Sequence, residues 1–335
     1  MQNLLDPAIL FFVFGVLAGA ARSNLEIPQP ISKFLSLYLL MALGLKGGFA
    51  LAKSGFGIEV MVSLTAAICM AFIVPAIGYT FLKNRVAKLD AAAIAASYGS
   101  VSAVTFVTAM QFLESSGLKF GGHMAVAMVL MESPAIIMAV LLANTLRQSK
   151  AAVAVSGGGT AVLAGVGGNS DLSIKKILHE SFTDGAHLLL LGAMAVGFIS
   201  SDAGKAVMQP FSGDLFKGML AFFLLDMGLM VARNFKDAQN ASPSLVAYAS
   251  IGPVVHAGIA LGLAYLLGMS AADTALLMVL SASASYIVVP AVLRYAIPEA
   301  NPALYFGLSL GITFPFNILI GIPLYTSVAQ HVLGT

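Results

Sequence analysis

Long, uninterrupted runs of apolar residues are the feature that most restricts how this chain of 335 residues can fold. The run from Ile58 to Leu82, for example, contains a single charged residue, Glu59. A helix of about 20 such residues is long enough to cross the roughly 30 Å hydrocarbon core of a bilayer. Because the runs are continuous rather than alternating, they favour spanning helices over the strands of a membrane β-barrel.

About ten segments of this kind follow one another along the chain. They lie near residues 8–22, 31–52, 58–82, 91–113, 122–146, 185–201, 212–232, 243–268, 271–295 and 303–329. Only 10% of the residues are charged and 59% are hydrophobic, so the chain cannot supply the polar surface that a soluble domain of this length needs. The sequence therefore predicts an all-α polytopic membrane protein.

The two halves of the chain resemble each other, which indicates an internal repeat. A shift of 180 positions places Gln29–Ser32 on Gln209–Ser212 and Leu45–Lys53 on Leu225–Arg233. A shift of 183 positions pairs Asp90 with Asp273, Ser100 with Ser283, and Ser102 with Ser285. Paired repeats in so apolar a chain are typical of secondary transporters, whose binding site lies between the repeats.

The loop cations predict how the halves are oriented. One set of loops carries 12 Lys and Arg residues, whereas the opposite set carries four, Lys53, Lys119, Lys205 and Lys217. The positive-inside rule then places both termini outside and residues 147–184 in the cytoplasm. Because five helices per half is an odd number, the second half enters the membrane from the other side, so the repeats are inverted.

We therefore expect three parts. Residues 1–146 form the first five-helix repeat, and residues 185–335 form the second, inverted one. Residues 147–184 form a cytoplasmic linker, rich in glycine, with a short interfacial helix over 174–182. The linker glycines are not followed by the Lys-Ser or Lys-Thr that a phosphate-binding loop requires.

Two repeat-related segments contain residues that interrupt a spanning helix. The fourth segment includes Ser97–Phe106, and the ninth includes Ser281–Pro290, each with several Ser, Gly or Ala residues near its middle. An interrupted helix exposes backbone N–H groups that favour an anion, while nearby carbonyl and hydroxyl oxygens suit a hard cation such as sodium. We expect both interruptions to meet at the membrane midplane. The alternative is that these small residues only permit close helix packing.

Charged groups inside the spans are the other candidates for function. Lys46 and Asp226 occupy equivalent repeat positions with opposite charge. Glu132 lies in the middle of the fifth segment, and Asn317 lies in the corresponding region of the tenth. Intramembrane ions usually face protein or water, so Glu132 is a candidate sodium or proton ligand. His123, His187 and His256 have no carboxylate or cysteine at ligand spacing, which favours structural roles for all three.

Other function classes lack their sequence signatures. His-Glu-x-x-His is absent, and no second aspartate accompanies Asp226 in an aspartyl-protease pattern, so we do not expect an enzyme. The formal net charge of +2 is too small to indicate a nucleic-acid partner.

The motifs together resemble the sodium-dependent bicarbonate transporter family first described in cyanobacteria, over essentially the whole chain. They are Gly44–Gly48, Gly99–Thr105, Met131–Ala135, Ser283–Pro290 and Thr313–Asn317. The resemblance implies ten spanning helices in two inverted five-helix repeats, a core and a gate domain, and a homotrimer. It also implies symport of bicarbonate with sodium, and control by a small PII-like cytoplasmic protein.

The sequence therefore predicts a sodium-coupled bicarbonate symporter of the plasma membrane, which in bacteria is the inner membrane. The expected anion ligands are Gly99, Ser100, Val101, Ser102, Thr105, Ser283, Ala284 and Ser285. The expected sodium ligands are Glu132, Ser102, Thr105 and Asn317. The alternatives are a transporter of another small anion, such as a carboxylate, and a membrane sensor or scaffold that transports nothing.

Overall fold

The computed structural model describes residues 6–55, 57–156, 185–239, 241–286, 289, 292–293 and 297–334. Every regular element in these ranges is helical. Six stretches of the described residues are long and apolar enough to cross a membrane. They are Gln29–Lys53, Ile58–Leu82, Lys88–Ser115, Gly185–Phe235, Pro243–Leu267 and Pro302–Leu333. The prediction of an all-helical, multi-pass membrane protein is confirmed for this part of the chain.

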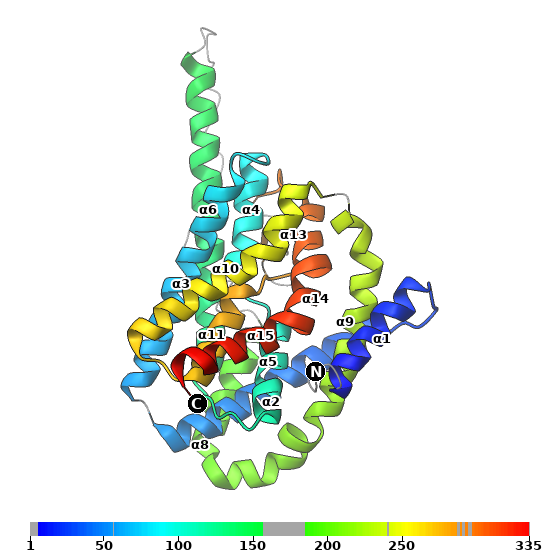
Figure 1. Ribbon diagram of the computed structural model, residues 1–335, viewed down its shortest axis with the longest axis vertical. Helices are drawn as coiled ribbons and strands as arrows, with labels where there is room; N and C mark the ends of the chain where they lie inside the picture. The colour runs from blue at the N-terminus through cyan, green and yellow to red at the C-terminus, as the bar shows by residue number, and fades with distance from the viewer. Residues whose placement is uncertain are drawn as a thin grey trace.

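The first half contains α1 (Pro7–Ala20), α2 (Gln29–Ser54), α3 (Ile58–Leu82), α4 (Lys88–Gly99), α5 (Ala103–Ser115) and α6 (Met124–Ser156). The end of α6 differs from the prediction, because its 33 residues extend past residue 146 into the expected linker. This extension projects above the other helices in Figure 1. The rest of the linker, including the predicted interfacial helix over 174–182, lies outside the described residues.

The second half contains α8 (Gly185–Gln209), α9 (Phe216–Gln239), α10 (Pro243–Leu267), α11 (Ala271–Ala282), α13 (Pro302–Leu308), α14 (Phe314–Phe316) and α15 (Ile322–Leu333). Wide π-helical turns at Ser309–Thr313 and Asn317–Gly321 flank α14, which contains Pro315. Proline supplies no backbone N–H, so the usual helical hydrogen-bond ladder cannot continue unchanged past Pro315.

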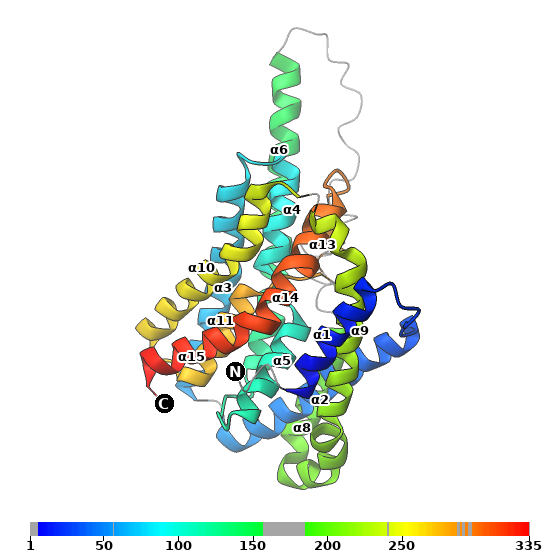
Figure 2. The same ribbon diagram turned by 45° about the vertical axis from the view of Figure 1, so that its right-hand side comes forward.

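Two groups of helices make up the molecule. In the first, α1 packs along α9 and α2 packs along α8; we call these four helices the paired-helix layer. The second, which we call the broken-helix bundle, contains α3 to α6, α10, α11 and α13 to α15. Figures 1 and 2 both show α1 beside α9, with α2 and α8 crossing at the end of the molecule opposite the α6 extension.

Glycines allow close contacts within the paired-helix layer. A Cβ atom on Gly48 of α2 would lie 2.1 Å from the carbonyl oxygen of Met194 in α8. A Cβ atom on Gly228 of α9, the repeat equivalent of Gly48, would lie 2.2 Å from the carbonyl oxygen of Phe12 in α1. Small residues permit such backbone approach between membrane helices. Both contacts join one half of the chain to the other.

The first turns of α4 and α11 are also held across the halves. The carboxylate of Asp90 in α4 accepts a hydrogen bond of 2.7 Å from the backbone N–H of Asn301. Its repeat equivalent in α11, Asp273, accepts one of the same length from the N–H of Gly121. Asn301 and Gly121 are themselves separated by 180 residues, the shift of the sequence repeat. These aspartates therefore fix the outer ends of the two helices that lead to the interruptions.

Candidate functional site

Helices α4 and α11 end at the predicted interruptions, where the backbone becomes extended. Helix α4 ends at Gly99 and α5 begins at Ala103. Helix α11 ends at Ala282, and the backbone is extended at Ser283 (φ −83°, ψ 165°). We call these two stretches, Ser100–Ser102 and Ser283–Ser285, the helix breaks.

The second helix break is hydrogen-bonded to the first break and to the last turn of α4. The N–H of Ser285 donates to the carbonyl oxygen of Ser97 over 2.8 Å, and the Ser97 hydroxyl donates to the Ser285 carbonyl over 2.5 Å. The N–H of Ser102 donates to the Ser283 hydroxyl over 3.0 Å. Backbone groups that leave a helix must find partners away from water, and here the last turn of α4 and the two breaks supply partners for one another. The breaks therefore cross at a defined point.

At this crossing, α5 begins with its N-terminus in the protein interior. The hydroxyl of Ser102 caps α5 by accepting a hydrogen bond of 3.2 Å from the N–H of Thr105. Two neighbouring hydroxyls, on Ser100 and Thr105, are buried without any hydrogen-bond partner in the described protein. Buried polar groups are normally paired. Unpaired hydroxyls beside a helix N-terminus therefore fit a site that is completed by a bound ion or water.

A cavity of about 70 Å³ adjoins the crossing, which we call the break cavity. It lies where the paired-helix layer meets the broken-helix bundle. Its lining residues are Ser36, Leu40, Val101, Ser102, Ala103, Val104, Met128, Glu132, Ala186, His187, Ser285 and Tyr286. Sites for drug-sized molecules occupy about 300–1,000 Å³, so a ligand of only a few atoms fits this cavity.

A buried acid–base pair forms one wall of the break cavity. Glu132 of α6 contacts the Nε2 atom of His187 in α8 through one carboxylate oxygen. The residues are 5% and 4% exposed, so the pair is shielded from water. The sequence favoured a structural role for His187, because no carboxylate or cysteine lies at ligand spacing from it. No local spacing signal could have revealed the pair.

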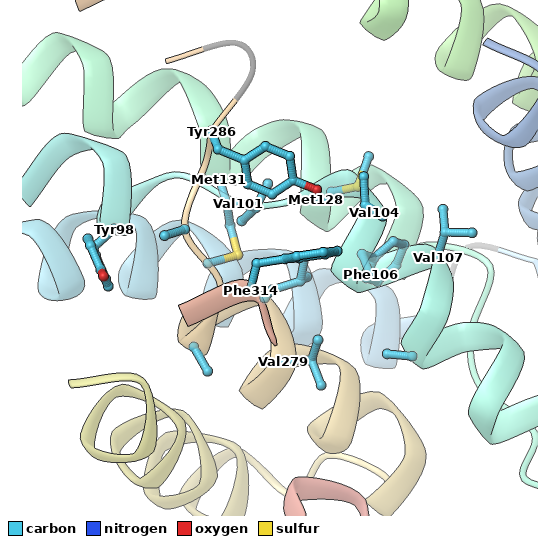
Figure 3. Close-up of a cluster of buried hydrophobic side chains, with 14 of the residues drawn as sticks. Tyr98, Val101, Val104, Phe106, Val107, Met128, Met131, Val279, Tyr286 and Phe314 are labelled. Atoms are coloured by element: carbon cyan, nitrogen blue, oxygen red, sulfur yellow. The ribbon is translucent and has the colours of Figure 1, made fainter. Parts of the chain in front are cut away.

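Apolar side chains supply much of the rest of the lining, and Phe314 packs against one of them, Tyr286. Figure 3 shows the rings of Tyr286 and Phe314 next to each other, with Val101, Val104 and Met128 beside them. The two ring centroids lie 5.3 Å apart in an edge-to-face arrangement. The break cavity thus combines a few polar groups with an apolar surround, an arrangement that fixes the orientation of a small ligand.

Of the predicted site residues, Val101, Ser102, Ser285 and Glu132 line the break cavity. The other predicted site residues do not line it. Gly99 faces the ring of Pro75, which leaves no room for a Cβ atom there. Ser283 holds Ser102, as described above, and Ala284 is buried in the core cluster.

Asn317 contacts the end of α11 rather than the break cavity. Its amide nitrogen donates to the Ala282 carbonyl oxygen over 2.8 Å, and its amide oxygen accepts from the Tyr325 hydroxyl over 3.2 Å. The side chain therefore fixes the last turn of α11 directly before the second break.

Lys46 and Asp226 lie away from the break cavity. The Nζ atom of Lys46 lies 2.8 Å from the Glu114 carboxylate and 4.1 Å from the centre of the Phe216 ring. The Asp226 carboxylate accepts a hydrogen bond from the Ser32 hydroxyl. Each charge therefore has a partner within the protein, as expected for an ion in an apolar segment.

These features, a small polar cavity at two crossed helix breaks in a membrane protein, agree with the family resemblance of the sequence. A family model described as the Na+-dependent bicarbonate transporter superfamily matches residues 7–330. The chain belongs to the Na+-dependent bicarbonate transporter superfamily. A comparison with curated proteins finds no match.

Membership of the Na+-dependent bicarbonate transporter superfamily implies sodium-dependent transport of bicarbonate, with sodium as the co-transported ion. It also indicates a transporter rather than an enzyme. The match covers both halves of the chain, so it includes both helix breaks and Glu132.

Proposed function

We propose that this protein is a sodium-coupled bicarbonate symporter that works by alternating access, with both ligands bound at the crossed helix breaks. The observation that carries the proposal is the break cavity, where Ser102 and Ser285 from the two breaks meet Glu132. Its volume of about 70 Å³ suits a small planar anion and disfavours a carboxylate with a sizeable apolar portion.

Bicarbonate would be held by residues in and beside the helix breaks, namely Gly99, Ser100, Val101, Ser102, Thr105, Ser283, Ala284 and Ser285. The N-terminus of α5 presents backbone N–H groups whose partial positive charge favours an anion. The unpaired hydroxyl of Ser100 adds a donor that the protein itself leaves unused. These groups are neutral, so they attract the anion through partial charges rather than through a full positive charge.

Sodium would bind beside the anion through oxygen atoms of Glu132, Ser102 and Thr105. Asn317, the fourth predicted ligand, would act indirectly, by holding the last turn of α11. The Glu132 carboxylate and the Ser102 hydroxyl line the same cavity, and the Thr105 hydroxyl is buried without a partner. Coupling has a simple origin, because each ion offsets the charge of the other and so raises its affinity.

The contacts between the halves support inverted repeats. The α1–α9 and α2–α8 contacts, and the Asp90–Asn301 and Asp273–Gly121 bonds, are each exchanged under the sequence repeat. We infer that the broken-helix bundle moves against the paired-helix layer, since the break cavity lies between them. Such motion would expose the crossing alternately to the two sides.

The loop cations support a plasma-membrane orientation with both termini outside the cytoplasm. We retain the homotrimer and the PII-like regulator only as what the family resemblance implies. Blue-native electrophoresis of the purified protein, and co-purification from the native host, would test them separately.

Uptake of radiolabelled bicarbonate into proteoliposomes tests the proposed function. We expect uptake under an inward sodium gradient, and none when potassium replaces sodium. The Ser102→Ala variant should transport at least about fivefold more slowly at subsaturating bicarbonate, since one hydrogen bond contributes about 1 kcal/mol. The matched control is Ser250→Ala, whose hydroxyl bonds only the backbone of its own helix, α10. Sodium-independent uptake, or equal uptake by both variants, would contradict the proposal.

A further inference from the structure

A large cavity lies beyond the break cavity, at the end of the molecule where α5 ends and α8 turns into α9. It has a volume of about 1180 Å³ and is open. Helices α2, α5, α8 and α9 line it, together with part of the loop before α6. We call it the lysine vestibule, because Lys46, Lys53, Lys119, Lys205 and Lys217 all line it.

The origin of these lysines makes the vestibule unusual. The sequence assigns four cations to the side of the membrane opposite the basic loops, Lys53, Lys119, Lys205 and Lys217. All four line the vestibule, although they come from different elements and span 165 positions of the sequence. The fold therefore gathers every loop cation of that side around one opening.

Acidic residues do not cancel this charge. Three acids line the vestibule, Glu114, Asp202 and Asp214, against five lysines. Glu114 is already paired with Lys46. Within the described chain, no ion pair involves any of the four exposed lysines. A concave surface with excess charge of one sign focuses the electric field and raises the local concentration of counter-ions.

Three helices connect the vestibule to the break cavity. Helix α2 contributes Leu40 to the break cavity and Lys46 to the vestibule. At a rise of about 1.5 Å per residue, these positions are about 9 Å apart along the helix axis. Helices α5 and α8 likewise line both cavities, through different residues at their two ends. No residue lines both, so the two cavities are separate in this structure.

We propose that the lysine vestibule captures small inorganic anions and delivers them to the break cavity. The inference rests on the proposed function in one respect, that the transported substrate is an anion. Capture is electrostatic and loose, because the lysines are exposed and flexible, whereas the break cavity makes the selective contacts. Neutralising the vestibule should therefore raise the KM for the anion and leave the maximal rate unchanged.

Uptake kinetics at several ionic strengths test this proposal. At low ionic strength, a charge about 8 Å from the anion changes its local concentration about twofold. At low ionic strength, replacing all four exposed lysines by glutamine should raise KM by about 16-fold, the product of four twofold effects, and flatten its dependence on ionic strength. Sodium is held constant, and ionic strength is set with the potassium salt of a bulky sulfonate buffer.

The matched control replaces Lys83 and Lys88, two exposed lysines of the opposite loops, by glutamine. This control should leave KM and its ionic-strength dependence within twofold of the unmodified protein. An unchanged KM in the vestibule variant, or an equal change in the control, would overturn the proposal.

A second experiment measures the vestibule potential without transport. Cys69 is the single cysteine, so a Cys69→Ala, Ala50→Cys protein carries one thiol, in the vestibule between Lys46 and Lys53. The rate of thiol modification is measured with an anionic and with a cationic methanethiosulfonate. Each rate is divided by the rate at which the same reagent modifies a small thiol in solution. The anionic reagent should be favoured, and the four glutamine substitutions should lower that preference at least about fivefold.

The two experiments separate the two hypotheses. A preference for the anionic reagent that the substitutions abolish, in a protein that does not transport bicarbonate, would support the vestibule and contradict the proposed substrate. Sodium-dependent bicarbonate uptake with no such preference would support the proposed function and overturn the vestibule.

Discussion

The break cavity and the lysine vestibule lie toward opposite ends of the same three helices, but they are built from different groups. The break cavity is small, about 70 Å³, and is lined by hydroxyls, apolar side chains and one buried acid–base pair. The vestibule is more than ten times larger and is lined by exposed lysines. The difference indicates that the break cavity discriminates between anions, whereas the vestibule attracts them.

The physics of the two regions supports this division. In the break cavity, ligand contacts are shielded from water, so the position of single atoms decides affinity. In the vestibule, water and salt screen each lysine, so only the sum of the charges matters. Single substitutions should therefore have large effects in the first region and small ones in the second.

The largest effect is expected when the break cavity is filled. Ser285→Leu replaces one oxygen by three carbons in a cavity of about 70 Å³, so the anion is excluded. Uptake of radiolabelled bicarbonate should fall at least about 100-fold. Gln209→Leu, an exposed residue of the vestibule, should stay within twofold. If uptake fell equally in both variants, the break cavity would be no more sensitive to a single substitution than the vestibule.

A smaller but still large effect is expected at Glu132. Glu132→Gln removes a charged oxygen ligand, whose contribution of about 1.5–3 kcal/mol corresponds to a rise of about 10- to 100-fold in the sodium concentration for half-maximal uptake. The comparison is Glu114→Gln in the vestibule, which should change this concentration less than twofold. Unchanged sodium activation in Glu132→Gln would contradict its role as a sodium ligand.

A moderate effect is expected at the unpaired hydroxyl of Ser100. Ser100→Ala should lower uptake about fivefold at subsaturating bicarbonate and leave thermal stability unchanged, because this hydroxyl has no partner in the described protein. Ser97→Ala is the contrasting variant. Its hydroxyl binds the Ser285 carbonyl and the Ser309 hydroxyl, so stability should fall by about 1–3 kcal/mol. A destabilised Ser100→Ala protein would argue for a structural role instead.

The smallest effect is expected at the Lys46–Glu114 ion pair. Their side chains are 21% and 35% exposed, and partly exposed pairs contribute at most about 1 kcal/mol. Lys46→Gln should therefore lower the midpoint of thermal unfolding by no more than about 2 °C. A much larger shift would show that this ion pair is needed to stabilise the vestibule. It would contradict the expectation that single substitutions there have small effects.

Local composition was enough to locate the helix breaks. Serines cluster at Ser100–Ser102, directly after Gly99, and at Ser283–Ser285, and the repeat places both clusters at matched positions. These residues lower helix stability directly, so their effect is visible in the sequence. The spanning segments were predictable for the same reason, since hydrophobic length is a local property.

Contacts between distant segments were not predictable. His187 lies 55 residues from Glu132, so only the folded chain reveals their pairing. The vestibule lysines likewise come together only in the folded chain. The extension of α6 to Ser156 was missed because an alanine-rich helix can continue beyond the apolar segment.

The exchanged contacts between the halves bear on how such a chain arose. Gly48 and Gly228 pack against the opposite half, and Asp90 and Asp273 bind its backbone. A single half would leave these faces unsatisfied unless a second copy covered them. On the proposed inverted arrangement, that copy must insert with the opposite topology. An ancestral single-repeat gene would therefore have encoded an antiparallel, dual-topology homodimer, and fusion of two copies later fixed each orientation in one polypeptide.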